Sequence, residues 1–162
     1  MSVNGELKKR YVEEILPRVC LEKKSSKREN GGKPEEAQEN YGSAATADVN
    51  CLQSLSQRIH FGKFVAESKF LSSPETFVPL IKAGDTEGID AAITNAAVER
   101  KVLERLRLKA ETYGVDPALE ADAPRKVDVE GVVAMYRDHV IPLTKVVEVE
   151  YLMQRLKGSE WE

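Results

Sequence analysis

Two cations lie on the apolar side of a predicted helix. Residues 41–70 have a helical period, and a helical wheel places Arg58 and Lys69 inside the arc of apolar side chains. The two cations are eleven residues apart. This spacing is about three turns, so their side chains project within about 20° of each other, about 16 Å apart along the axis. Because burying an unpaired charge costs several kcal/mol, we expect an anion beside them. The apolar arc consists of Leu55, Ile59, Gly62, Val65, Ala66 and Phe70.

Polar groups also occupy the apolar sides of two later helices. Glu99 lies at the centre of an apolar stripe predicted for residues 95–113, and Asn95 lies one turn before it. Glu148 lies on the apolar side of the last predicted helix, one turn after Thr144. Three helices therefore each direct polar side chains inward. The stripe around Glu99 contains Val102, Leu103, Leu106, Ala110 and Tyr113.

These charged and polar groups allow different interpretations. The cations and carboxylates could form internal salt bridges, or the cations could extend to the solvent along apolar surface. The same groups could instead line a pocket for a small, anionic, hydroxylated ligand. Asn95 and Thr144 exceed what two ion pairs require, which favours the pocket. In such a pocket, burial would favour the protonated form of a glutamate and make it a hydrogen-bond donor at mildly acidic pH.

The composition indicates a single domain without a strong electric field. A chain of 162 residues is expected to form one core. Its formal net charge of −3 favours neither nucleic acid nor an anionic membrane as a partner. Cys20 and Cys51 show no metal-ligand spacing, and no apolar run resembles a signal peptide or a membrane span. We therefore expect a cytoplasmic protein. His60 and His139 have no Ser, Cys or acidic partner at a spacing typical of catalysis, so we expect both to be structural.

Helical patterns predominate along the chain, so we expect an all-α fold. Residues 22–40 are charged, contain glycine and have no period, which predicts a flexible loop. Pro17 is expected to close the first helix, and Pro142 to kink or divide the last one. Ser73 and Pro74 are typical of a helix start. The predicted helices span residues 6–16, 41–70, 73–82, 85–93, 95–113 and 127–156.

Four segments closely resemble the eukaryotic chorismate mutases, and the fungal ones in particular. The segments are NYGSAATADVNCLQSLSQRIHFGKFVAESKF, ITNAAVERKVLERL, KAETYGVDP and VIPLTKVVEVEYLMQRL. The similarity extends from about Leu7 to near Leu156, outside the charged loop. The resemblance implies a single all-α domain of the AroQ type that forms a homodimer and requires no cofactor. It also implies the conversion of chorismate to prephenate, on the route to phenylalanine and tyrosine.

The resemblance assigns catalytic roles to the same polar residues. It implies that Arg58 binds a substrate carboxylate and that Lys69 donates to the ether oxygen of the breaking bond. Glu148 would donate to that same oxygen when it is protonated, and Glu99 would face the ring hydroxyl. Two further groups near the substrate complete the implied catalytic set: Asn95, and Thr144, which helps to hold a carboxylate.

The resemblance also implies a regulatory site for an aromatic amino acid at a subunit interface. In the fungal members of the family, tyrosine inhibits and tryptophan activates. A glycine and a serine at this point are equally typical of the start of a long helix, and both roles can hold together. The implied regulatory residues are Asn40, Gly42, Ser43 and Thr46.

One part of the family pattern lies outside the chain. Family members carry a long N-terminal segment. Its first helix has an arginine that binds the second substrate carboxylate, and a later pair of arginines completes the tyrosine site. We expect this chain to begin after both, as an N-terminally truncated member. Two alternatives follow. The chain is a chorismate mutase whose activity the truncation limits or abolishes, or it is a non-catalytic helical protein that binds aromatic amino acids or associates with an intact mutase subunit.

Overall fold

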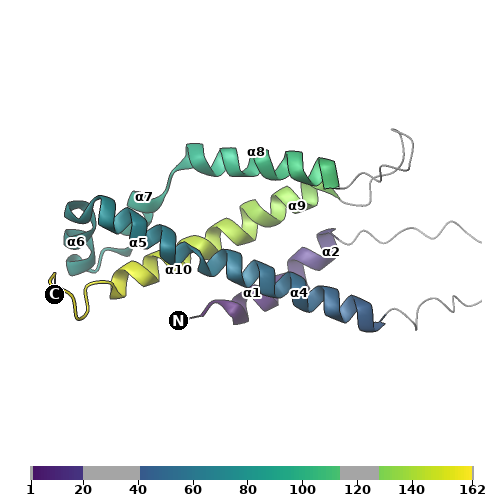
Figure 1. The fold of residues 1–162 in the computed structure, drawn as a ribbon, viewed down its shortest axis with the longest axis horizontal. Helices are drawn as coiled ribbons and strands as arrows, with labels where there is room; N and C mark the ends of the chain where they lie inside the picture. Colours follow the sequence, from purple (N-terminus) through teal and green to yellow (C-terminus); the bar gives the residue numbers. More distant parts are fainter. Residues whose placement is uncertain (1, 20–40, 114–127, 162) are drawn as a thin grey trace, which may run out of the picture.

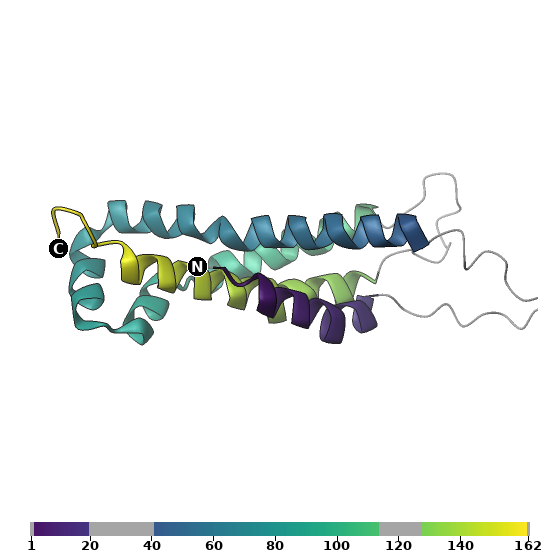
Figure 2. The ribbon, with the colours of Figure 1, turned by 90° about the horizontal axis from the view of Figure 1, so that it is seen from below.

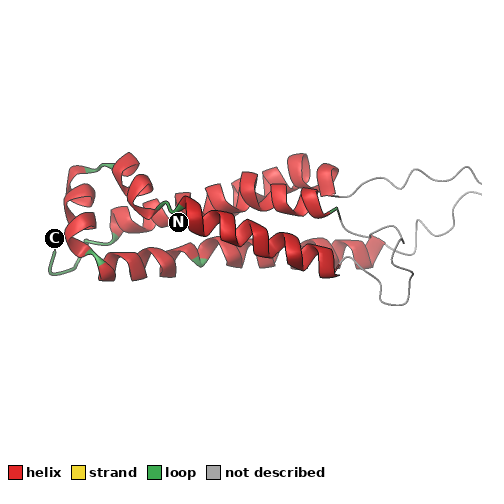
Figure 3. Ribbon diagram, turned by 90° about the horizontal axis from the view of Figure 1, so that it is seen from above, coloured by secondary structure: helices red, strands yellow, loops and turns green. Residues whose placement is uncertain are grey.

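The computed structural model describes residues 2–19, 41–113 and 128–161. All of the regular secondary structure in these ranges is helical, which confirms the all-α prediction (Figure 3). The helices form an elongated bundle (Figure 1). The loop predicted for residues 22–40 lies outside the described residues.

The described helices follow the predicted order along the chain. Two segments, η1 and η2, are π-helical, and each of them is continuous with the α-helices on both sides. The bounds are α1 (Asn4–Arg10), η1 (Tyr11–Ile15), α2 (Leu16–Val19), α4 (Tyr41–His60), α5 (Gly62–Ser72), α6 (Pro74–Ala83), α7 (Thr86–Ile93), α8 (Ala96–Tyr113), α9 (Val129–Met135), η2 (Tyr136–Val140) and α10 (Ile141–Gln154).

The helix predicted for residues 41–70 is divided into α4 and α5, which meet at Phe61. The backbone of Phe61 stays close to the helical region, with φ −61° and ψ −16°, and its amide still donates to the Gln57 carbonyl at 2.9 Å. The two helices therefore continue one another as a long rod that packs on α10 (Figure 2). The interruption is followed directly by Gly62, which is buried.

Gly62 permits α5 and α10 to approach each other closely. A Cβ atom at this position would lie 2.9 Å from Thr144 Cγ2 and 3.1 Å from Glu148 Cγ. Both distances are shorter than a favourable contact between carbon atoms. A residue without a side chain therefore lies beside two of the predicted catalytic residues.

The two prolines that were expected to interrupt helices do not end them. The first helix continues through Pro17 to Val19, and the last described helical region continues through Pro142 to Gln154. The predicted end at Pro17 is therefore wrong. Of the two outcomes predicted for Pro142, a kink or a division, the division does not occur. Proline lacks an amide hydrogen, and its ring crowds the carbonyl four residues earlier. A π-helical segment ends two residues before each proline and widens the preceding turn, so that the amides of Leu16 and Ile141 donate to carbonyls five residues back.

The helix α10 contributes to two apolar clusters. Leu143 and Val147 pack against α1, η1 and α4, whereas Leu152 packs against α5, α6 and α7. Thr144 and Glu148 therefore lie on a helix that is fixed by packing in both directions. Four members of the predicted apolar arc are buried in these clusters, namely Leu55, Ile59, Ala66 and Phe70, whereas the fifth apolar side chain, Val65, is 43% exposed.

The short helices α6 and α7 place the carbonyl of Ile93, the last residue of α7, beside Lys69 of α5. As predicted, Ser73 precedes α6 and Pro74 is its first residue. The αL conformation of Gly84, with φ +70°, ends α6. The carboxylate of Asp85 then caps α7 by accepting from the Gly88 amide at 2.8 Å.

The helix α8 is thinly covered in comparison. It packs on α9, and Ala110 is its buried residue. Val98 is 54% exposed and Tyr113 is 84% exposed, so the prediction that Tyr113 faces the core is wrong. The wheel detects an apolar side of a helix but does not show whether another part of the same chain covers it. Among the described helices, none is long and apolar enough to cross a membrane.

Candidate functional site

A cavity of about 310 Å³ lies where α8 faces α5 and α10. Its volume is at the lower end of the range for small-molecule sites. The cavity brings together all six of the predicted catalytic residues, from α4, α5, α8 and α10 and from the turn before α8. Their catalytic roles stay predictions. The cavity is lined by Arg58, Val65, Lys69, Ile93, Asn95, Val98, Glu99, Val102, Val140, Ile141, Thr144, Lys145 and Glu148.

Lys69 and Glu148 form an ion pair across the cavity wall. The Lys69 ammonium donates to Glu148 Oε2 at 3.1 Å and to the Ile93 carbonyl at 2.7 Å. The side chain of Glu148 is only 8% exposed, whereas that of Lys69 is 34% exposed. The interpretation of an internal salt bridge is therefore correct for Lys69, and the pair borders a cavity at the same time.

Burial raises the pKa of Glu148 above its ordinary value. The Lys69 ammonium opposes this rise through its hydrogen bond and its charge, and Lys145 and Arg58 oppose it through charge alone. Burial outweighs them because Lys69 is partly hydrated and shares its protons with the Ile93 carbonyl. A neutral Glu148 can donate a hydrogen bond into the cavity, as the sequence predicted.

Arg58 differs from Lys69 in its surroundings. Its side chain lines the cavity but is exposed, and it makes no hydrogen bond or ion pair with any described residue. Of the interpretations that the sequence left open, an internal salt bridge therefore holds for Lys69, and extension to the solvent holds for Arg58. Its long side chain reaches the solvent past the buried Leu55 and Ile59. Its guanidinium remains available to an anionic ligand.

Glu99 is paired with Lys145, a residue that the sequence analysis missed. Lys145 Nζ lies 2.8 Å from Glu99 Oε1, and both groups line the cavity. Lys145 lies beside the apolar stripe of its helix rather than inside it, so its position on the helical wheel does not mark it. Its position directly after Thr144 and three residues before Glu148 could have identified it. The described cavity thus contains three cations, Arg58, Lys69 and Lys145, and two carboxylates.

Asn95 and Thr144 already have partners within the protein. The side-chain oxygen of Asn95 caps α8 by accepting from the amides of Ala97 and Val98, each at 3.1 Å. Only its amide NH₂ group is therefore left for a ligand. The Thr144 hydroxyl donates to the Val140 carbonyl at 2.7 Å, so it has to rotate before it can donate to a substrate carboxylate.

The residues predicted to bind a regulatory amino acid lie at the other end of α4 from Arg58. Gly42, Ser43 and Thr46 are exposed, and the Thr46 hydroxyl donates to the Gly42 carbonyl at 2.9 Å. The helix begins at Tyr41, so Gly42 and Ser43 lie inside its first turn rather than before it. Arg58 lies sixteen positions after Gly42 along the helix, which corresponds to about 24 Å. Asn40 lies outside the described residues.

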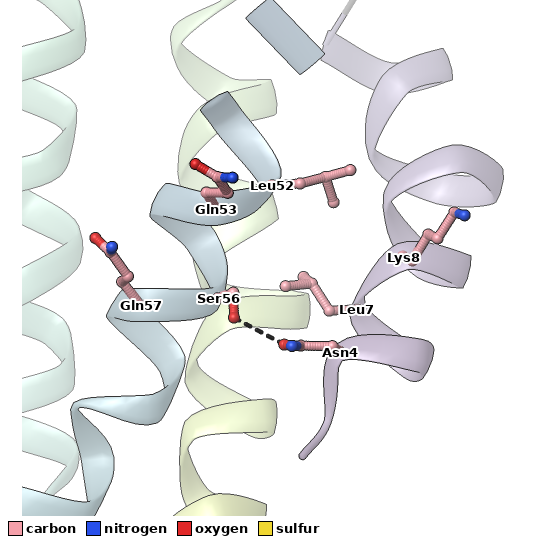
Figure 4. Close-up of a pocket in the computed structure, with 7 residues that line it drawn as sticks. All are labelled: Asn4, Leu7, Lys8, Leu52, Gln53, Ser56 and Gln57. Carbon is pink, nitrogen blue, oxygen red and sulfur yellow. Dashed lines mark hydrogen bonds between the residues drawn. The ribbon is translucent and has the colours of Figure 1, made fainter. Parts of the chain in front are cut away.

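A second groove, of about 340 Å³, lies between α1 and α4 (Figure 4). It contains one cation, Lys8, and no carboxylate. The hydroxyl of Ser56 donates to Asn4 Oδ1 at 2.7 Å across this groove. Its lining lacks the mixture of charges found in the cavity beside Glu148. Among the described residues, no three His, Cys, Asp or Glu side chains group together as a metal site.

Comparisons with known proteins identify the family. Residues 40–149 match the family described as chorismate mutase type II. The chain is 62% identical over 162 residues to the chorismate mutase of Emericella nidulans, covering 100% of this chain and 59% of that protein. It is similar to the crystal structure of chorismate mutase from Candida albicans in complex with L-Trp, with a TM-score of 0.81, 46% identity, and coverage of 99% of this chain and 56% of that one.

A second solved structure agrees with these matches. AtCM1 with tyrosine bound in its allosteric site has a TM-score of 0.76 and 36% identity, and the match covers 96% of this chain and 56% of that one. The chain therefore spans a little more than half the length of these proteins. The matches confirm the resemblance that the sequence motifs indicated, and the chain belongs to the chorismate mutase type II family.

Proposed function

We propose that this polypeptide is a chorismate mutase, which converts chorismate to prephenate at the cavity between α8 and α10. One observation carries the proposal. The cavity combines three cations with a buried carboxyl group, Glu148, whose pKa is raised by burial. A ligand with two carboxylates and an ether oxygen matches this combination of cations and a neutral donor.

The chemistry of the reaction explains why such groups suffice. The rearrangement breaks the ether C–O bond and forms a C–C bond within one molecule, and it needs neither a nucleophile nor a proton transfer. An enzyme accelerates it by holding the reactive conformer and by stabilising the negative charge that develops on the ether oxygen. Fixed cations and hydrogen-bond donors can do both.

Lys69 and Glu148 are the donors proposed for the ether oxygen. Because both side chains already meet at the same wall, one oxygen atom can lie between Lys69 Nζ and a protonated Glu148 carboxyl. Arg58 then binds a substrate carboxylate. With Glu148 neutral and Lys145 paired with Glu99, Arg58 and Lys69 leave a net charge of +2 in the cavity, which balances a dianionic substrate.

The test is a turnover assay on the purified chain. Chorismate loss and prephenate formation are measured together, and circular dichroism establishes that the protein is helical. We expect a rate well above the uncatalysed background, with saturation by chorismate. A helical protein whose rate equals the background would contradict the proposal.

We further propose that tyrosine and tryptophan bind as effectors at Asn40, Gly42, Ser43 and Thr46. The comparison structures support this proposal, because one contains L-Trp and another contains tyrosine in an allosteric site. Calorimetric titration of each amino acid tests it. Binding that is weakened by Thr46→Val would support the proposal, and absence of heat at millimolar amino acid would contradict it. Binding without turnover would instead favour a non-catalytic helical protein.

The proposed assembly is a homodimer in the cytoplasm. Apolar side chains on α8, including Val98 and Leu108, are exposed. This supports a dimer in which a second protomer covers them. Cys51 is exposed and free, which suits a reducing compartment. Sedimentation equilibrium tests the assembly, since a dimer has twice the mass of the chain and a monomer would contradict the proposal.

A further inference from the structure

We propose that Lys145 is a positioning residue, which holds the N-terminal turn of α8 against α10 through its ion pair with Glu99. The inference rests on the proposed mutase function and adds a residue to the site. Lys145 acts on the substrate indirectly, because its ammonium is engaged with the Glu99 carboxylate at 2.8 Å.

The ion pair is the link that joins α8 to α10. Among the described residues, no other hydrogen bond or ion pair connects these two helices. Near its other end, α8 is joined to α9 by the pairing of Arg107 with both carboxylate oxygens of Glu130. The helix is thus tied down at two points, and only the Lys145 link lies at the cavity.

Apolar packing cannot replace this link. The buried residue of α8, Ala110, lies three turns away from Glu99, whereas Val98 beside Glu99 is 54% exposed. The side chains of Lys145 and Glu99 are 26% and 32% exposed, so their pair is partly shielded from water. Within α8 the first turn is therefore held by a charge rather than by a core, and the buried Ile93 anchors the chain two residues before Asn95.

Two predicted catalytic residues depend on the position of that turn. Asn95 caps α8 and Glu99 follows one turn later, so both move with the start of the helix. A displacement of about 1 Å can reduce turnover by about a hundredfold. The stability of the fold should change little, because partly exposed ion pairs contribute little to it. Loss of activity without loss of stability is therefore the signature of this role.

The experiment is a double-mutant cycle on the full chain. Lys145→Met is expected to lower kcat/KM by on the order of tenfold or more, and Lys145→Arg, which can restore the ion pair, should recover most of the loss. In the Glu99→Gln background, Lys145→Met should have little further effect, because the link is already broken. Lys157→Met, which removes an exposed cation outside the cavity, is the matched control and should leave kcat/KM unchanged.

Three outcomes would overturn the inference. The first is an equal loss from Lys145→Met in both backgrounds, since Lys145 would then act without Glu99. The second is an unchanged kcat/KM in Lys145→Met. The third is a melting temperature that falls in proportion to activity, because the role would then be merely structural.

A binding measurement separates this inference from the proposed function. The probe is a bicyclic ether dicarboxylate that mimics the transition state of the rearrangement. If the wild-type chain binds the probe without converting chorismate, the proposed function fails alone, and the same cycle on the dissociation constant tests Lys145. Lys145→Met should then weaken probe binding, and Lys145→Arg should restore most of it. In the Glu99→Gln background, Lys145→Met should change the dissociation constant little. Absence of both turnover and probe binding in the folded wild-type chain would contradict both proposals.

Discussion

The two walls of the cavity are held in different ways. The wall formed by α5 and α10 lies between two apolar clusters, and its carboxyl group, Glu148, is buried. The wall formed by α8 has exposed apolar side chains and is joined to α10 by one ion pair. In the wall formed by α5 and α10, packing excludes water and burial raises the pKa of Glu148. In the wall formed by α8, the position of the first turn depends on the single pair of Lys145 and Glu99.

Replacing Lys69 should have the largest effect, because it removes a cation from the packed wall. Lys69→Met is expected to lower kcat by on the order of a hundredfold or more, since a donor to the developing charge is lost. It should also raise the pKa of Glu148 further, because burial would no longer be opposed by the ammonium. Steady-state kinetics measure the first effect and carbon-detected NMR titration of glutamate measures the second.

The matched control is Lys63→Met, which removes a half-buried cation from α5 outside the cavity. Its kcat should equal that of the wild-type protein. If Lys69→Met retained near-normal turnover while remaining folded, the assignment of Lys69 as a donor to the ether oxygen would be incorrect.

Glu148 should make activity depend on pH. If the protonated carboxyl is the donor, kcat/KM of the wild-type protein falls about tenfold for each pH unit above the folded-state pKa. Glu148→Gln donates at every pH, so its profile should be flat over the same range. A profile that falls equally in both proteins would show that another group titrates.

The same group links stability to pH, and the sign follows from the raised pKa. The folded protein retains the Glu148 proton in a pH window in which the unfolded chain has released it. The contribution of the neutral carboxyl to stability is therefore full below its ordinary pKa and is lost as pH rises through the folded-state pKa. Denaturant unfolding of wild-type and Glu148→Gln proteins at several pH values measures this difference.

Gly62→Ala should disturb the packing between α5 and α10. The added methyl group would lie 2.9 Å from Thr144 Cγ2 and 3.1 Å from the Thr144 carbonyl oxygen, so either Thr144 must shift or α5 and α10 must separate. We expect a loss of about 1–3 kcal/mol in the free energy of unfolding, and a fall in kcat on the order of tenfold from the displaced Glu148. Gly5→Ala is the control, since nothing lies within 4 Å of the new methyl group. Equal stability of the two variants would contradict the close approach.

The smallest effect is expected from the far end of α8. Arg107 and Glu130 form an exposed pair there, outside the cavity that contains Glu148. Arg107→Met should leave kcat/KM unchanged and lower the melting temperature by at most a few degrees. A large loss of activity would show that the whole of α8, rather than its first turn, depends on electrostatic links.

Helical periodicity predicted most of the fold, and a charge on an apolar side predicted most of the cavity. Lys69, Glu99 and Glu148 were found in this way because each interrupts a stripe that packing would otherwise fill. Lys145 was not found, because a cation beside a stripe looks like an ordinary solvated residue. Its role depends on which residue of another helix faces it, which a single helical wheel does not contain.

The errors have similar causes. Pro17 and Pro142 were expected to interrupt helices, but a π-helical segment before each proline accommodates the ring. Tyr113 was placed on the apolar side of α8, and the last turn of that side is uncovered among the described residues. For Arg58 the sequence left a salt bridge and extension to the solvent open, and its long side chain reaches the solvent. In each case the outcome was decided by surrounding structure that the local sequence does not specify.

The central claim is that the cavity beside Lys69 and Glu148 is the catalytic site. A crystal structure of the chain with the bicyclic ether dicarboxylate tests it most directly. We predict that the ether oxygen lies within hydrogen-bonding distance of Lys69 Nζ and the Glu148 carboxyl, with a ligand carboxylate on Arg58. A ligand bound instead in the groove between α1 and α4, with the cavity unoccupied, would contradict the claim.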